Sequence, residues 1–214
     1  MSVCKINIQN TQRIFRCLLL LLALFSGFLH SADSPILQLG QKQQSDNLFP
    51  QVKVETALGD ILIELDRYRA PITSNNFLGY VVSGRYDGTI FHRVVADFVV
   101  QAGGYDQLFN PRPQDTPIFN ESGNGLRNQQ YSIAMAREDD PHSATNQFYF
   151  NLADNEGLDP GKSWGYAVFG WVVEGSEILD RIGRTPVAKN DELDWEDVPK
   201  RSIIIKKVVL LEEN

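Results

Sequence analysis

Cysteine and histidine are scarce in this 214-residue chain, and their positions limit the chemistry that it can perform. The two cysteines, Cys4 and Cys17, both lie near the N-terminus. The rest of the chain therefore has no thiol, no disulfide and no cysteine-ligated metal. Its histidines, His92 and His142, are too few for a metal cluster without help from carboxylates. We expect no metal, no cofactor and no covalent nucleophile.

Positive charge is also in short supply, with 20 Lys and Arg residues against 27 Asp and Glu residues. The formal net charge is −7. Lys5, Arg13 and Arg16 are the only charges before Asp33, so a chain without that segment would carry −10. A balance this acidic argues against nucleic acid and anionic membrane surfaces as partners. The 43% hydrophobic content is that of an ordinary globular domain with a real core.

The first 32 residues combine a basic start with an apolar run at 17–29 that is short for a bilayer span. We interpret them as an export signal, which predicts a periplasmic protein. An uncleaved anchor that holds the domain to the membrane, facing the periplasm, is the alternative. Residues 33–50 are polar and Gln-rich without periodicity, so we expect a linker. The folded domain is then predicted to span 51–214.

Short strand patterns dominate the predicted domain, with only two helical segments among them. One helix is expected to begin at Pro71 and end at Gly84, and the other to run from Ser176 to Gly183. The expected strands are 51–56, 61–65, 90–95, 98–102, 131–136, 147–151, 167–173 and 202–211. Many short antiparallel strands with two helices predict a mainly β protein, a closed barrel capped at its ends.

The stretch 90–104 is unusual because polar side chains interrupt two apolar runs. A turn centred near Ala96 would place Arg93 opposite Val99, with Gln101 diagonally across and on the same face. One interpretation is an edge hairpin whose Arg points into water. The other is an amide-recognition site, in which Arg93 donates to a carbonyl and Gln101 fixes its pose.

The same stretch reads Phe-His-Arg, then Phe98, then Gln101 and Gly103-Gly104, and it closely resembles the signature of the cyclophilins. These proteins are peptidyl-prolyl cis/trans isomerases. The resemblance continues in order through 131–137, 143–150 and 165–175, and it covers roughly 51–211. It implies an eight-stranded antiparallel β-barrel. It also implies that proline-containing unfolded or partly folded polypeptides are the substrates of a monomeric enzyme.

Motif positions carry the family's functional roles onto this chain. Arg93 would be the electrostatic catalyst and Gln101 its orienting neighbour. The implied substrate-binding residues are Phe98, Val99, Arg137, Gln147, Tyr149, Leu158 and Tyr166. Of these, the apolar side chains and Tyr149 would form the proline pocket. Arg137 would hold the substrate main chain, and Gln147 and Tyr166 would lie at the rim.

Several positions depart from the family pattern. Val99 replaces the usual Met, and Tyr149 replaces a Phe, which adds a hydroxyl to the pocket. Gly157 stands where a Trp or Phe commonly precedes Leu-Asp, so an aromatic wall is missing. The segment 191–197 carries five carboxylates around one Trp, and we expect it to be a solvated loop.

Two further functions compete with an exported prolyl isomerase. One is a non-catalytic proline-peptide binding module or chaperone on the same barrel. The other is a hydrolase that uses His92. We disfavour the hydrolase because strand alternation should turn His92 away from Arg93, and no Ser or Asp is tied to it by a motif.

Overall fold

Residues 34–213 are described in the computed structural model of the protein. The segment interpreted as an export signal lies outside the described residues. Within 34–213, no helix is both long and apolar enough to cross a membrane.

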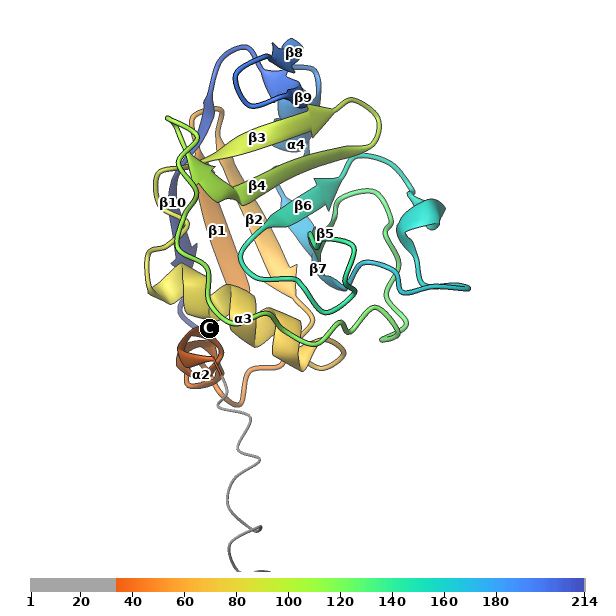
Figure 1. Ribbon diagram of the computed structural model, residues 1–214. Helices are drawn as coiled ribbons and strands as arrows, with labels where there is room; N and C mark the ends of the chain where they lie inside the picture. Colours follow the sequence, from red (N-terminus) through yellow and green to blue (C-terminus); the bar gives the residue numbers. More distant parts are fainter. Residues whose placement is uncertain (1–33, 214) are drawn as a thin grey trace, which may run out of the picture. The chain divides into compact units, whose positions relative to one another are not determined.

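Eight strands close into an antiparallel barrel in the order β1-β10-β3-β4-β6-β5-β7-β2 (Figure 1). Their bounds are β1 Gln51–Thr56, β2 Asp60–Leu65, β3 Thr89–Val95, β4 Val99–Asp106, β5 Ser132–Met135, β6 Phe148–Asn151, β7 Val168–Glu174 and β10 Ile203–Leu210. The first and last strands pair with each other, as Val52 lies opposite Leu210. The predicted closed eight-stranded barrel is confirmed.

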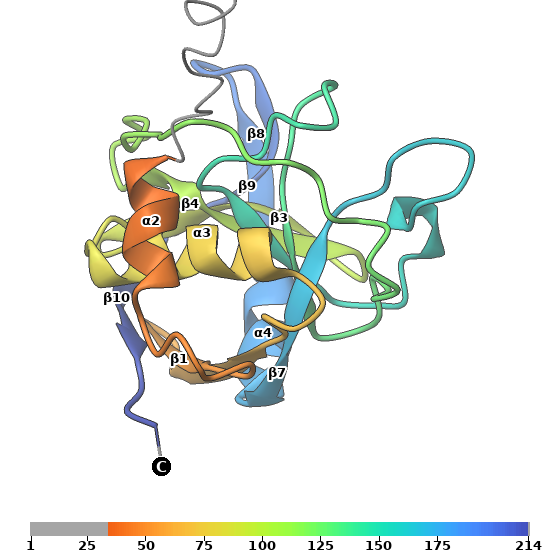
Figure 2. The same cartoon turned by 90° about the horizontal axis from the view of Figure 1, so that it is seen from below.

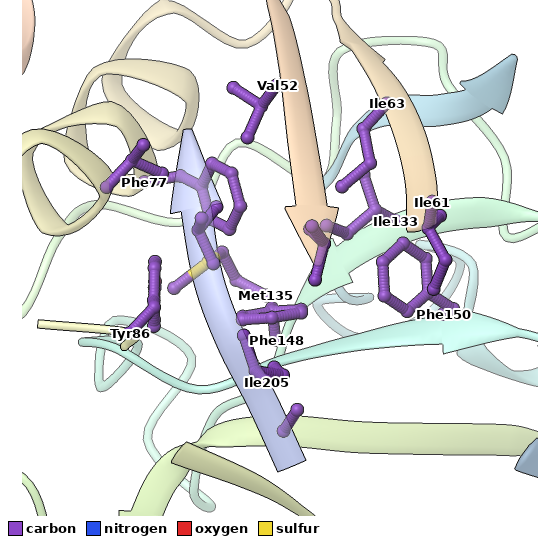
Figure 3. Packing of buried hydrophobic residues seen from close by; sticks show 14 of the residues in the cluster. Val52, Ile61, Ile63, Phe77, Tyr86, Ile133, Met135, Phe148, Phe150 and Ile205 are labelled. Carbon is purple, nitrogen blue, oxygen red and sulfur yellow. The ribbon is translucent and has the colours of Figure 1, made fainter. Parts of the chain in front are cut away.

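Strand alternation fills the barrel interior. In β1, Val52 and Val54 are fully buried while the residues between them are half-buried, and β2 repeats this pattern. Aromatic rings complete the core, and the Phe77 ring lies 5.3 Å from that of Phe148 in an edge-to-face arrangement. Figure 3 shows these side chains converging between the strands.

The two predicted helices are present and cover the barrel. Helix α3, Pro71–Val82, has proline in its first turn and buries Phe77 and Leu78 against the core. Helix α4, Ser176–Gly183, is amphipathic and buries Ile178, Leu179 and Ile182.

The prediction that 33–50 is a polar linker is wrong. Residues Pro35–Gln41 form a third helix, α2, whose N-cap Ser34 accepts a hydrogen bond from the Leu37 amide at 3.2 Å. Helix α2 packs against α3 (Figure 2). The contact is close because it joins two glycines. A β-carbon on Gly79 would stand 2.0 Å from the Ile36 carbonyl oxygen, and one on Gly40 would meet Asn75. The described domain therefore begins at Ser34.

A buried arginine anchors the chain between α2 and β1. Arg67 is only 6% exposed, and its guanidinium donates to the carbonyls of Gly40, Gln43, Gln44 and Asn47 at 2.5–3.3 Å. The carbonyls of Gln43 and Asn47 have no other donor among residues 34–213, whereas those of Gly40 and Gln44 also accept from the backbone amides of Gln43 and Asn47. This cage of hydrogen bonds around the Arg67 guanidinium, together with the glycine contact between α2 and α3, explains why so polar a segment packs on the barrel.

The hairpin of β3 and β4 has a different register from the predicted one. Arg93 lies directly opposite Gln101, and Val95 lies opposite Val99. The turn is centred on Asp97, which adopts a left-handed backbone with φ of 57°, as three-residue hairpin loops often require. The prediction that Arg93 faces Val99 is therefore wrong, and the correct register brings the two polar side chains closer together.

Residues 187–199 form a second, two-stranded sheet in place of the expected solvated loop. Strands β8, Val187–Asn190, and β9, Trp195–Pro199, pair as a hairpin that lies beside β3 (Figure 1). The Trp195 ring packs edge-on against Tyr105 at 4.7 Å and near Phe109 at 6.0 Å. Because one aromatic side chain anchors it, the acidic segment is held against the barrel.

Candidate active site

The predicted catalytic pair lies on the outside of the barrel, on adjacent strands. Arg93 of β3 has a side chain that is 41% exposed. Gln101 of β4 donates from Nε2 to Oε1 of Gln147 at 2.8 Å. The guanidinium itself approaches Asp197, with Nε 3.9 Å from Oδ2. Gln101 is thus fixed by Gln147, and an acidic residue of β9 stands beside Arg93.

The predicted proline pocket is assembled as a separate apolar cluster. Val99 and Tyr149 are buried with Ala134 and Val168 outside the barrel core, which is filled by their alternating neighbours such as Val100 and Phe150. Phe98, Leu158 and Tyr166 pack against this cluster. The five aromatic or apolar residues predicted for the pocket and its rim therefore lie together. They lie next to Gln101, because Gln101 of β4 is paired with Tyr149 of β6.

The hydroxyl of Tyr149 is used inside the protein. It donates to Oδ1 of Asn128 at 2.7 Å, and the same oxygen accepts from Nδ2 of Asn151 at 3.2 Å. Burial raises the pKa of Tyr149 well above its ordinary value. The extra oxygen therefore tethers the pocket to the 120–130 segment.

Replacing Tyr149 with Phe is expected to lower the free energy of unfolding by about 1 kcal/mol, because one buried neutral hydrogen bond is lost while Asn128 keeps its second donor. Urea denaturation measures this change. Tyr166→Phe is the matched control, because no hydrogen bond to the Tyr166 hydroxyl is found among residues 34–213. Equal losses in the two variants would contradict the tether.

Arg137 forms one side of the site, but its guanidinium is largely occupied. It donates to the carbonyls of Trp164 at 2.9 Å and of Glu138 at 2.7 Å, and it lies over the Tyr166 ring at 4.6 Å. Arg137, Gln101 and Gln147 line one hollow of about 180 Å³. The structure therefore brings the predicted main-chain-binding residue into the site, and it orients the loop that carries Tyr166.

His92 faces the same side as Arg93, so the expectation that it turns away is wrong. Phe91 lies opposite Ala102 and Arg93 lies opposite Gln101, which leaves His92 as the extra residue of a β-bulge. The bulge shifts the alternation by one position. The His92 ring is 6% exposed and packs edge-on against Tyr105, at 4.9 Å between centroids.

A second cavity, of about 420 Å³, opens beside the guanidinium of Arg93. Sequence reasoning missed this side of the site, although the single Trp among carboxylates was a signal that the acidic segment packs on something. The cavity is lined by His92, Arg93, Gln101, Tyr105, Gln147, Asp194, Trp195, Glu196 and Asp197. We call it the acidic cavity.

Burial lowers the pKa of His92 from 6.5 to about 4. An unfolded chain takes up a proton near pH 6.5, whereas the folded protein resists protonation until about pH 4. Stability is therefore complete above pH 6.5 and falls as the pH drops toward 4. Between pH 6 and 5, the chain takes up roughly one extra proton when it unfolds. The unfolding free energy of the wild type should therefore decrease as the pH falls through this range.

Urea denaturation at several pH values measures this dependence. The His92→Gln variant lacks the titrating group and should lose most of the slope in this window. His142→Gln is the matched control and should keep it. A slope that survives in His92→Gln would show that another group is responsible.

Among residues 34–213, no group of three or more His, Cys, Asp or Glu side chains is placed to hold a metal ion. The site combines one exposed guanidinium, an apolar cluster and a pair of glutamine amides. Such a set can bind a peptide and stabilise developing polarity in an amide.

Comparison with known proteins gives a consistent answer. A sequence model of the family described as cyclophilin type peptidyl-prolyl cis-trans isomerase/CLD matches residues 51–210. Peptidyl-prolyl cis-trans isomerase cyp18 of Streptomyces antibioticus is 45% identical, and the match covers 75% of this chain and 98% of that protein. Peptidyl-prolyl cis-trans isomerase B of Escherichia coli is 41% identical, and the match covers 75% of this chain and 99% of that protein.

A similar fold is found among solved structures. A cyclophilin type peptidyl-prolyl cis-trans isomerase of Cryptosporidium parvum superposes with a TM-score of 0.64 and 24% identity. The superposition covers 78% of this chain and 99% of that one.

Proposed function

The chain belongs to the cyclophilin-type peptidyl-prolyl cis-trans isomerases, and we propose that it lowers the barrier to X–Pro rotation by placing the Arg93 guanidinium against the twisted amide. The observation that carries this proposal is the position of Arg93, a half-exposed cation beside an apolar cluster and a pair of amide side chains.

The reaction breaks no covalent bond, which fits a site without a nucleophile. Resonance flattens the amide and sets a barrier of about 18–20 kcal/mol, so the uncatalysed isomerisation takes roughly tens to hundreds of seconds. Rotation to 90° removes the resonance and leaves a lone pair on the proline nitrogen. A donor that binds this state better than the planar one accelerates the rotation.

Each part of the site has a distinct task in this mechanism. The cluster of Phe98, Val99, Tyr149 and Leu158 would bind the proline ring, whose transfer from water supplies binding energy. Gln101 and Gln147, already paired with each other, present amide groups to the peptide main chain. Arg93 then differs from the rest because its charge favours the twisted amide over both planar isomers.

The substrates proposed for this site are proline-containing segments of unfolded or partly folded polypeptides. In support, the related isomerase of Cryptosporidium parvum has been solved in the presence of the dipeptide Ala-Pro. We propose that the protein acts as a monomer, because residues of a single chain are enough to assemble the apolar cluster and the Gln101–Gln147 pair beside Arg93. Light scattering at working concentration tests this.

Export is proposed from the first 32 residues, where a basic start precedes an apolar run. The clients would then be proteins that fold outside the cytoplasm. Cell fractionation with N-terminal sequencing tests this proposal. A shortened chain in the periplasmic fraction supports it, and a full-length chain that only detergent extracts supports a membrane anchor instead.

Exchange NMR on a short X–Pro peptide tests the catalytic proposal directly. The protein should make cis and trans signals exchange far faster than the uncatalysed interconversion of tens of seconds. The same spectra report binding through peptide line widths. Binding without accelerated exchange would reject the catalytic role and leave a proline-peptide binding module.

A further inference from the structure

The acidic cavity described above has no task in the proposed mechanism, yet it adjoins the catalytic guanidinium. Its floor is made of side chains from β3 and β4, and its far wall is the β8–β9 hairpin. Four consecutive residues of that wall, 194–197, line it. Asp194 and Asp197 adopt left-handed backbones with φ of 54° and 60°, so this run departs from simple strand alternation.

Negative charge predominates at this cavity. Asp194, Glu196 and Asp197 contribute three carboxylates. Arg93 approaches Asp197 at 3.9 Å, and Lys189 binds Asp194 at 2.6 Å and Glu196 at 3.3 Å. Three carboxylates against these two cations leave one negative charge. Once Arg93 turns toward a substrate amide, Asp197 also loses its partner.

The imidazole of His92 forms part of the cavity lining and is only 6% exposed. Its Nδ1 is closed off from solvent and therefore does not reach into the cavity. Burial lowers the pKa of the ring to about 4, so the ring is neutral near pH 7 and does not repel a cation bound in the cavity.

The remaining walls are aromatic. The rings of Tyr105 and Trp195 lie 4.7 Å apart at the edge of the cavity. Electron-rich faces next to carboxylates suit the aliphatic stem and charged head of a long basic side chain. An anionic side chain would meet repulsion here, and a small apolar one would leave the net negative charge of the cavity uncompensated.

The acidic cavity connects with the rest of the site. Gln101 and Gln147 line both this cavity and the hollow that Arg137 borders. A peptide main chain that crosses the two glutamines, with its proline in the apolar cluster, therefore passes from one depression to the other.

We propose that the acidic cavity is a subsite for a Lys or Arg side chain of the substrate, close in sequence to the isomerised proline. This inference rests on the proposed function, because it places the peptide across Arg93 and Gln101. It makes Asp197 and Glu196 specificity-determining residues, and it makes basic polypeptide segments the preferred substrates.

The experiment uses peptides of one length that contain a single proline, with Lys, Gln or Glu placed in turn at the two positions on either side. Exchange NMR on each peptide gives both the dissociation constant and the rate of cis–trans exchange. We expect Lys at one of these positions to bind about 5-fold more tightly than Gln at low salt, since partly exposed charge pairs are worth about 1 kcal/mol. The preference should shrink in 0.5 M salt.

Charge-neutralising variants assign the preference to the cavity. Asp197→Asn with Glu196→Gln should reduce the Lys-to-Gln ratio to about one. The matched control is Asp191→Asn with Glu192→Gln, which removes the same charge from the same hairpin but not from the cavity lining, and it should keep the ratio. The indole signal of Trp195, identified with Trp195→Phe, should shift with the Lys peptide.

Two outcomes would overturn the proposal. One is the absence of any Lys preference at the four positions. The other is an equal loss of preference in both double variants, which would indicate general attraction to an acidic protein. Exchange of the Gln peptide is a separate readout, because it tests catalysis by Arg93 without involving the subsite.

Discussion

Arg93→Ala is expected to lower kcat/KM by at least ~100-fold, equivalent to about 2.7 kcal/mol of transition-state stabilisation. The reason is that the guanidinium interacts more strongly with the twisted amide than with either planar isomer, so its removal affects the transition state more than the bound peptide. Peptide affinity depends mainly on the apolar cluster of Phe98, Val99 and Leu158 and should fall much less. Exchange NMR separates the two quantities.

Arg93→Lys provides the matched substitution, because it retains the charge. It should rescue poorly, since a point ammonium lacks the planar fork that addresses nitrogen and carbonyl together. Both variants should fold normally by circular dichroism, because the side chain is 41% exposed and outside the core. Retention of more than a tenth of the wild-type kcat/KM in Arg93→Ala would show that Arg93 is not the main source of acceleration.

Arg67→Ala should lower the free energy of unfolding by about 3 kcal/mol or more, because a buried charge-assisted network is removed and the carbonyls of Gln43 and Asn47 lose their donor. These two carbonyls can regain partners if residues 40–47 separate from the barrel and bind water. Hydrogen exchange should therefore show loss of protection in α2 before any loss in the strands.

Arg201→Ala is the control for this prediction. Arg201 is exposed, and its side chain has no ion pair or hydrogen bond among residues 34–213. Substitutions at such surface positions change stability by about 0.5 kcal/mol or less, so this variant should remain near the wild type in urea denaturation and hydrogen exchange. If the two arginine variants behave alike, the cage around Arg67 does not hold the N-terminal segment.

Strand alternation and motif spacing were sufficient to predict the barrel and most of the candidate site. Val52 and Val54 alternate with polar neighbours, and this period of two is what an inward-facing strand requires. The residues from Phe98 to Tyr166 assigned to the pocket come together because they belong to strands and loops whose order the barrel topology determines.

The errors share a physical cause, which is that tertiary contacts outweighed local patterns. Helix α2 has only seven residues and depends on two glycine contacts, so its sequence shows no helical periodicity. The hydrogen bonds that hold the segment after it come from Arg67, which lies elsewhere in the chain. One extra residue at His92 changes which side chains share a face, and periodicity cannot reveal a bulge. The β8–β9 hairpin depends on where Trp195 packs.

The pairing of β1 with β10 has a consequence for how the chain folds. The barrel closes only when Val52 and its neighbours find Leu210 and its neighbours, almost the whole length of the domain apart. Contacts so distant in sequence slow the folding transition, because the entropy of loop closure is lost before the pairing repays it. During synthesis, β1 would wait for the last strand to emerge. Until then the strand edges of β1 and β3 are both exposed, and unpaired edges of this kind are the sites where strands of other chains can add.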